Sequence, residues 1–163
     1  MADAATMTMK AVLLPDEIQA TLKDLTFSYT PADATEMWFY GIVNVPHNTG
    51  SVDLISGKFL ANADGVQTGT ANEDIATTDK VRFLFIKNAD ATDSLYLVLD
   101  GSTPARNSTV VLEIGTGESW SCKPTNTTIG DIKCITVDSA SGVLSAGDAN
   151  VQCIVAAILD DVA

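Results

Sequence analysis

Three short apolar runs between Lys80 and Trp120 form the clearest pattern in the chain. They read KVRFLFIKN, SLYLVLDG and TVVLEIGTGESW, and each ends on a turn-forming cluster. β-branched and aromatic residues dominate the runs, as they do in strands. The connections leave no room for crossover helices. The pattern therefore predicts antiparallel strands joined by hairpin-length loops.

Similar runs occur on both sides of this block. Glu36–Val45 reads EMWFYGIVNV, with a glycine that suits a β-bulge, and it is followed by Pro46 and a turn. The runs VDLISGKF, DIKCITV and VQCIVAAIL are further candidates, whereas 61–79 is nearly devoid of apolar residues and predicts a long loop. About eight strands at such spacing predict an all-β fold, an antiparallel β-sandwich or jelly roll.

The N-terminal part divides differently. Residues 1–14 predict an N-terminal arm, and 15–163 predict a single β-sandwich domain. The segment after Pro15 fits two structures. Ile18, Leu22 and Leu25 have the spacing of a short helix, while the threonine-rich stretch that follows favours a strand.

Several runs are apolar on both faces of the strand they predict. Leu95, Leu97 and Leu99 share one face, yet Tyr96 and Val98 occupy the other. A free-standing two-layer sandwich has polar outer faces. Either a third layer within the chain or a neighbouring subunit must cover these residues, and the lack of helices favours a homo-oligomer. The residues expected at this interface are Met7, Met9, Val12, Leu13, Ile86, Val98, Ile154 and Ile158.

Composition limits the possible partners. The chain has 163 residues, with 9 basic and 21 acidic side chains and a formal net charge of −12. Such a surface repels phosphate, which argues against nucleic acid and anionic membranes as partners; the acidity also fits a role in solubility alone. The start of the chain lacks a basic region followed by an apolar run, so we expect folding in a reducing cytoplasm.

The three cysteines, Cys122, Cys134 and Cys153, have no CxxC spacing. We expect buried reduced thiols, with one disulfide plus a free thiol as the alternative. The aspartates at 90, 93, 100, 160 and 161 could supply oxygen ligands for a calcium ion, but no D-x-D-x-D-G loop is present. No metal or cofactor is expected.

Catalytic motifs are equally hard to find. His47 is the only histidine and lies in a turn without a G-x-S-x-G partner. The stretch GTGES lacks the GK[ST] ending of a phosphate-binding loop, so it predicts a hairpin turn with Gly115 or Gly117 at positive φ. Trp38 and Trp120 are candidates for glycan stacking, but their apolar surroundings favour core packing. We expect a protein that is not an enzyme.

The strand and turn sequences resemble a known class of proteins. KVRFLFIKN, LYLVLDG, LEIGTGESWSCKP and VQCIVAAILDD, in this order, are similar to the small β-sandwich virion proteins of tailed bacteriophages, particularly of cyanophages and other marine phages. AVLLPDEI and TFSYTPADATEMWFY resemble the start of such chains, so the similarity extends from about residue 11 to the end.

This resemblance implies a structural component of the phage particle, first of all a head decoration or cement protein. A tail, baseplate or fibre component is the alternative. The implied partners are the major capsid protein or other virion proteins, and the implied location is the virion, assembled in the host cytoplasm. The resemblance carries over no catalytic residues.

Overall fold

The structure, a computed structural model, describes residues 4–13, 20–32, 35–47, 50–57, 74–103, 112–138, 143 and 150–162. Over these residues it consists of β-strands and one short 3₁₀-helix. The elements are β1 (Ala5–Leu13), β2 (Ala20–Tyr29), β3 (Glu36–Val45), β4 (Val52–Asp53), β5 (Lys80–Asn88), β6 (Ser94–Val98), β7 (Leu112–Ile114), β8 (Ser119–Cys122), η1 (Ile129–Asp131), β9 (Lys133–Val137) and β10 (Val151–Asp160). Within the described ranges, no helix has the length and apolarity to cross a bilayer.

The first compact unit, Met1–Ala32, contains the antiparallel hairpin of β1 and β2. Its register runs from Ala5 opposite Tyr29 to Leu13 opposite Ala20, with one irregularity after Met9. The two compact units divide after Ala32, whereas the sequence placed a boundary after residue 14; β2 pairs with β1 and belongs to the same unit. The helical alternative is wrong from Ala20 onward, and residues 14–19 lie outside the described part.

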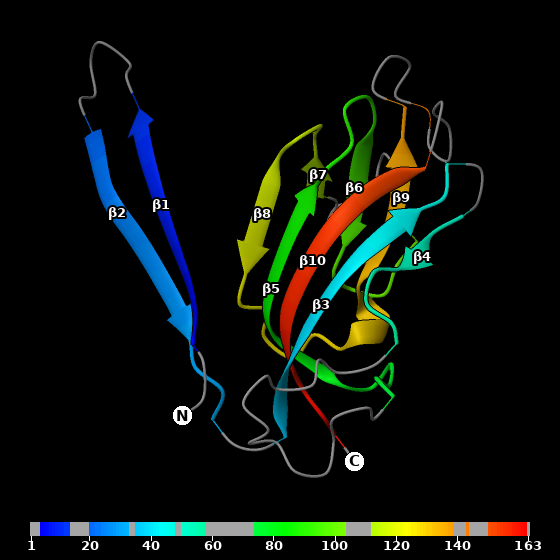
Figure 1. Cartoon of the computed structure of the whole chain (residues 1–163), viewed down its shortest axis with the longest axis horizontal. Coiled ribbons are helices and arrows are strands. Elements are labelled where there is room, and N and C mark those ends of the chain that lie inside the picture. Colours follow the sequence, from blue (N-terminus) through cyan, green and yellow to red (C-terminus); the bar gives the residue numbers. More distant parts are fainter. Residues whose placement is uncertain are drawn as a thin grey trace. The chain divides into compact units, whose positions relative to one another are not determined.

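The second unit, Asp33–Ala163, contains two four-stranded antiparallel sheets with the strand orders β3-β10-β5-β8 and β4-β9-β6-β7. Figure 1 shows the first sheet in front of the second, in a sandwich-like arrangement. The predicted all-β antiparallel fold is confirmed. The predicted hairpins are not all present, because β5 and β6 lie in different sheets, as do β7 and β8. Among the described strands of the Lys80–Trp120 block, β6 and β7 are the only consecutive ones that pair, while β5 pairs with β8 across the block.

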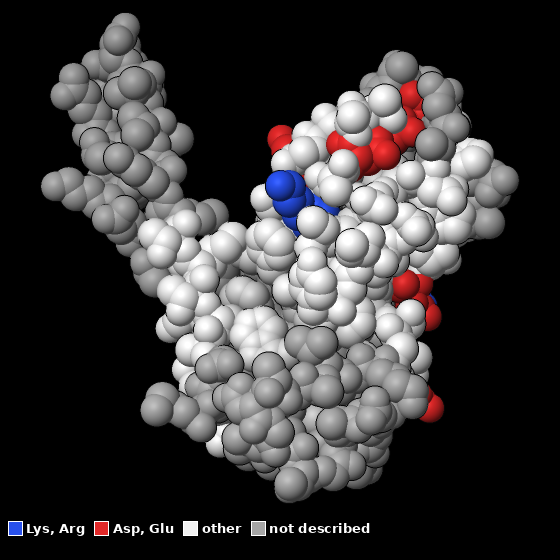
Figure 2. All heavy atoms as spheres, viewed as in Figure 1, with Lys and Arg blue, Asp and Glu red and all other residues white. Residues whose placement is uncertain are grey.

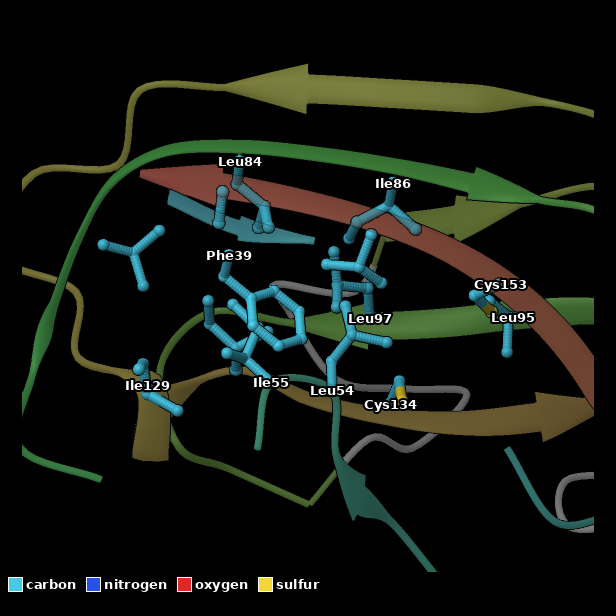
Figure 3. Close-up of a cluster of buried hydrophobic side chains, with 14 of the residues drawn as sticks. Phe39, Leu54, Ile55, Leu84, Ile86, Leu95, Leu97, Ile129, Cys134 and Cys153 are labelled. Atoms are coloured by element: carbon cyan, nitrogen blue, oxygen red, sulfur yellow. The ribbon is translucent and has the colours of Figure 1, made fainter. Parts of the chain in front are cut away.

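The core lies between the two sheets of the second unit. Figure 3 shows Phe39, Leu84 and Ile86 from one sheet directed toward Leu95 and Leu97 from the other. Each of these side chains is at most 5% exposed. The sheets alternate as half-buried strands should, with every second residue entering this cluster.

A β-bulge changes which residues of β5 face the core. Ile158 of β10 stands opposite Phe83, but the next residue stands opposite Val81, so one residue of β5 is skipped. As a result Val81, Leu84 and Ile86 join the core cluster, while Phe83 and Phe85 do not. Strict alternation along the sequence would place Val81, Phe83 and Phe85 on one face, but alternation breaks at a bulge.

Candidate functional site: an uncharged outer sheet face

The histidine that sequence analysis considered is a structural turn residue. His47 follows β3 and is half-buried. Its Nδ1 lies 3.0 Å from Oδ1 of Asn150, which also accepts a hydrogen bond from the His47 backbone N–H. An amide side chain does not titrate, so this contact orients the ring and joins the turn to the start of β10 without forming a catalytic pair.

The glycine-containing turn Gly115–Ser119 connects the two sheets. Gly117 has φ 71°, as expected, and the Glu118 N–H donates to the Gly115 carbonyl. The Gly115 N–H donates in turn to the Glu118 carboxylate at 2.9 Å. This amide is thus occupied by a carboxylate of the protein itself. The predicted hairpin is wrong, however, because β7 and β8 belong to separate sheets.

The aspartate that comes after β5 stabilises a tight turn. Asp90 Oδ1 accepts hydrogen bonds from the Thr92 N–H, the Thr92 hydroxyl and the Asp93 N–H. Burial opposes ionisation of Asp90, but these hydrogen bonds together outweigh it and lower the pKa of the carboxyl below its usual value. No group of three or more His, Cys, Asp or Glu residues among those described has a metal-binding arrangement.

The cysteines are free thiols that pack as apolar residues. Cys134 and Cys153 are buried and Cys122 is half-buried. Burial raises the pKa of Cys122 to about 11 and that of Cys153, with a smaller contribution from the charge of Asp90, to about 12. Burial also raises the pKa of Cys134. All three are therefore poor nucleophiles in the folded chain.

The most distinctive surface is the side of the β3-β10-β5-β8 sheet that points away from the core. We call it the outer face. Three rows of directly opposed residues, each running from β3 through β10 to β5, form it: Trp38–Ile158–Phe83, Tyr40–Ala156–Phe85 and Ile42–Ile154–Lys87.

Exposure on the outer face increases from the Trp38–Ile158–Phe83 row toward the Ile42–Ile154–Lys87 row. Ile158 is 0% and Phe83 5% exposed, whereas Tyr40 and Ile42 are 55% and 58% exposed. Large apolar side chains that stand this far in water next to one another are characteristic of surfaces that bind a partner. Sequence analysis did not name Tyr40 as a candidate, because its run is apolar on both faces and does not show which face is exposed.

Charge is nearly absent from this face. Lys87 is the one charged residue in its three rows. Figure 2 shows the same side of the molecule, where the described atoms over β10 and β3 are neither acidic nor basic. In a chain of net charge −12, such an area is where a partner can approach without strong electrostatic repulsion.

An ion cluster marks the other end of the outer face. Arg82 of β5 places Nη2 2.5 Å from Asp160 Oδ2 on β10 and Nε 3.3 Å from Glu36 Oε1 on β3. The Glu36 side chain is only 5% exposed, so the guanidinium compensates a carboxylate that has lost most of its water. The cluster links β5, β10 and β3 by ion pairs at the end of the apolar rows.

The outer side of the second sheet differs. Val98, Ile135 and Val137 point away from the core cluster, yet they are only 1%, 5% and 2% exposed. Of the two explanations that the sequence left open, coverage within the chain holds for this side. Only the β3-β10-β5-β8 sheet exposes large apolar residues from its strands, among the residues described.

The expected interface residues do not all reach a surface. Ile86 is a core residue that faces the second sheet, and Val98 and Ile158 are buried, so none of these three is accessible in the single chain. Ile154 is partly exposed on the outer face. Met7 is half-buried in the hairpin, and the side chains of the remaining candidates lie outside the described part: Met9, Val12 and Leu13.

Comparison with known proteins finds no relative. No protein-family model matches the chain, and neither a curated protein nor a solved structure matches it.

Proposed function

We propose that the chain is a non-enzymatic structural protein of a bacteriophage particle, most specifically a decoration or cement protein that binds the major capsid protein and stabilises the head. The observation that supports this most strongly is the outer face, where Tyr40 and Ile42 stand exposed on an acidic chain. A protein that works by binding a larger assembly needs such a face and needs no catalytic group.

Strand order gives a second argument. Consecutive strands from β3 to β10 change sheet at every step except β6 to β7. We interpret this order as a jelly roll, the eight-stranded double sheet found in viral capsid proteins and lectins. The architecture supports a role either in recognition or in assembly. The sequence resemblance to phage virion proteins favours the assembly role.

Electrostatics suggest which side of a shell the protein occupies. Packaged DNA repels a chain of net charge −12, so a position on the inner surface is unfavourable. On the outer surface the same charge keeps neighbouring copies soluble and apart except where the uncharged face makes contact. Binding to the assembled shell in preference to free subunits then stabilises the shell by mass action.

Heads that lack the protein provide the direct test. Purified full-length chain would be added to heads from a phage whose gene for it is deleted, followed by sedimentation and by heating with a DNA-binding dye. We expect saturable co-sedimentation and a higher temperature of DNA release. Heads that neither bind the protein nor gain stability would contradict the proposal.

Location separates the two particle sites that the resemblance allows. Antibody-gold labelling of native virions should mark heads. Label confined to the tail, baseplate or fibres would replace the decoration role with host attachment.

A further inference from the structure

Strand β3 lies at the edge of its sheet. Among the strands that the structure describes, its one neighbour is β10, which pairs with all ten residues from Glu36 to Val45. Natural edge strands are usually protected by lysines, prolines or shortness. β3 is long, contains no proline or lysine, and has its single charged residue at its first position. Such an edge is suited to pairing with another strand.

We propose that a second copy of this chain pairs with β3, strand to strand and antiparallel, about a two-fold axis through Gly41. Directly opposed residues of an antiparallel pair lie on the same face, so this register keeps both outer faces on one side. Tyr40 then stands opposite Ile42 of the partner subunit, and Ile42 opposite Tyr40 of the partner subunit. The two exposed large apolar residues of β3 thus cover each other twice.

This register suits the side chains that surround the axis. An aromatic residue opposite a β-branched one is a favourable cross-strand pair, and the symmetry forms it on both sides of Gly41. Gly41 adds no side chain to the contact, since a Cβ at this position would point toward the Phe39 ring. Tyr40 and Ile42 are each one residue away from Gly41, so a two-fold axis through Gly41 places each of them opposite the other. No other pair of exposed large apolar residues on β3, among the residues described, has this relationship to the axis.

The charges fit the same arrangement. Glu36 of each copy stands opposite Pro46 of the partner subunit, at the two far ends of the interface. The two Glu36 side chains are then about 30 Å apart, well beyond the ~8–10 Å over which salt screens charge. Since each copy has a net charge of −12, a contact whose centre lacks carboxylates is the one through which two copies can meet.

The pairing deepens the proposed function without depending on it. Two four-stranded sheets would join into one continuous sheet, with the outer faces of both copies side by side. The area that a shell could contact is thereby doubled. Dimerisation is measured in solution, without particles, so its failure and the failure of head binding are distinguishable.

Light scattering after gel filtration of the full chain tests the interface. We expect a dimer that Ile42→Lys dissociates, lowering the association constant by roughly tenfold or more, because two cations would enter an apolar contact. Val143→Lys is the matched control, since Val143 is 52% exposed but lies outside β3, and it should leave the dimer intact. Ile42 is 58% exposed, so circular dichroism should show Ile42→Lys folded.

A crosslinking experiment tests the register. The double variant Tyr40→Cys, Ile42→Cys should form intermolecular disulfides under mild oxidation, because opposed residues have the required Cα separation. Each single variant should not, since identical positions are offset along the strands. Gly41 is left intact because a Cβ there would lie 2.9 Å from the Phe39 ring. A monomeric wild-type chain, a dimer unaffected by Ile42→Lys, or crosslinking by the single variants would overturn the proposal.

Discussion

Ile42 of β3 lies directly opposite Ile154 of β10, on the side of the sheet that points away from the core. Ile42 is 58% exposed and Ile154 is partly buried, although both belong to regular strands. Burying a side chain such as Ile42 is worth roughly 1.5–3 kcal/mol, so leaving it in water forgoes that stabilisation. A partner that covers Ile42 and Ile154 would regain this burial free energy. This is the physical reason to treat the outer face as a binding surface.

The core assignment predicts unequal effects for two similar substitutions. Leu97→Ala should destabilise the chain by about 2–5 kcal/mol, because Leu97 is 2% exposed within the core cluster. Phe85→Ala should cost clearly less, since Phe85 lies half-buried on the outer face. Urea melts of both variants measure the difference. Equal losses would mean that the two faces of β5 are misassigned.

The ion cluster predicts an asymmetric response to mutation. Arg82→Met should lower the free energy of unfolding by about 1–3 kcal/mol, because it removes the positive charge that lies beside the buried Glu36 carboxylate. Adding Glu36→Gln should restore part of the loss, since a neutral amide is cheaper to bury. A double-mutant cycle by chemical denaturation measures this coupling. Strict additivity would argue that the Arg82–Glu36 contact is energetically irrelevant.

The division into two units predicts the effect of truncation. Removing residues 1–32 should leave the second unit folded, because its two sheets and core are built within Asp33–Ala163. The melting temperature of the shortened chain, followed by circular dichroism, should stay within a few degrees of the full chain. If the hairpin contributes to attachment, the shortened chain should bind heads more weakly. Unfolding of the shortened chain would refute the division.

Burial of the thiols predicts slow alkylation and sensitivity to alkaline pH. At pH 8 iodoacetamide should modify Cys122 faster than Cys153, and unfolding in guanidinium should expose all three cysteines, as peptide mass spectrometry would reveal. The folded chain raises the pKa of Cys153 from 9.0 to about 12, so it disfavours the thiolate. The corresponding stabilisation is complete below pH 9 and is lost as pH rises from 9 toward 12. Rapid labelling of Cys153 in the folded chain would contradict the assigned burial.

The sequence predicted the fold class well because alternation and turn residues act locally. The runs at Glu36–Val45 and Lys80–Asn88 are strands with the expected bounds. Connectivity was not predictable in the same way, since a five-residue link after Asn88 can close a hairpin or cross to the opposite sheet. Pairing β10 between β3 and β5 depends on contacts more than sixty residues apart, and no local pattern encodes it.

The sequence predicted that an apolar surface exists, but it did not predict most of the residues that form it. Apolar residues on both faces of the strands indicated a covered surface, and Ile154 lies on it. Ile86 was misplaced because a bulge near Phe83 reverses the alternation of β5. Tyr40 and Ile42 belong to a run that is equally apolar at core positions such as Phe39, so only the fold distinguishes the exposed residues from the buried ones.

Hydrogen exchange of the β3 amides at several protein concentrations tests the central claim most directly. If β3 and the outer face meet a second copy, amides of β3 on the side away from β10 should exchange more slowly as concentration rises, while those in the turn at Asp90 should not change. Exchange of β3 that is fast and independent of concentration would show that this edge and face stay in water.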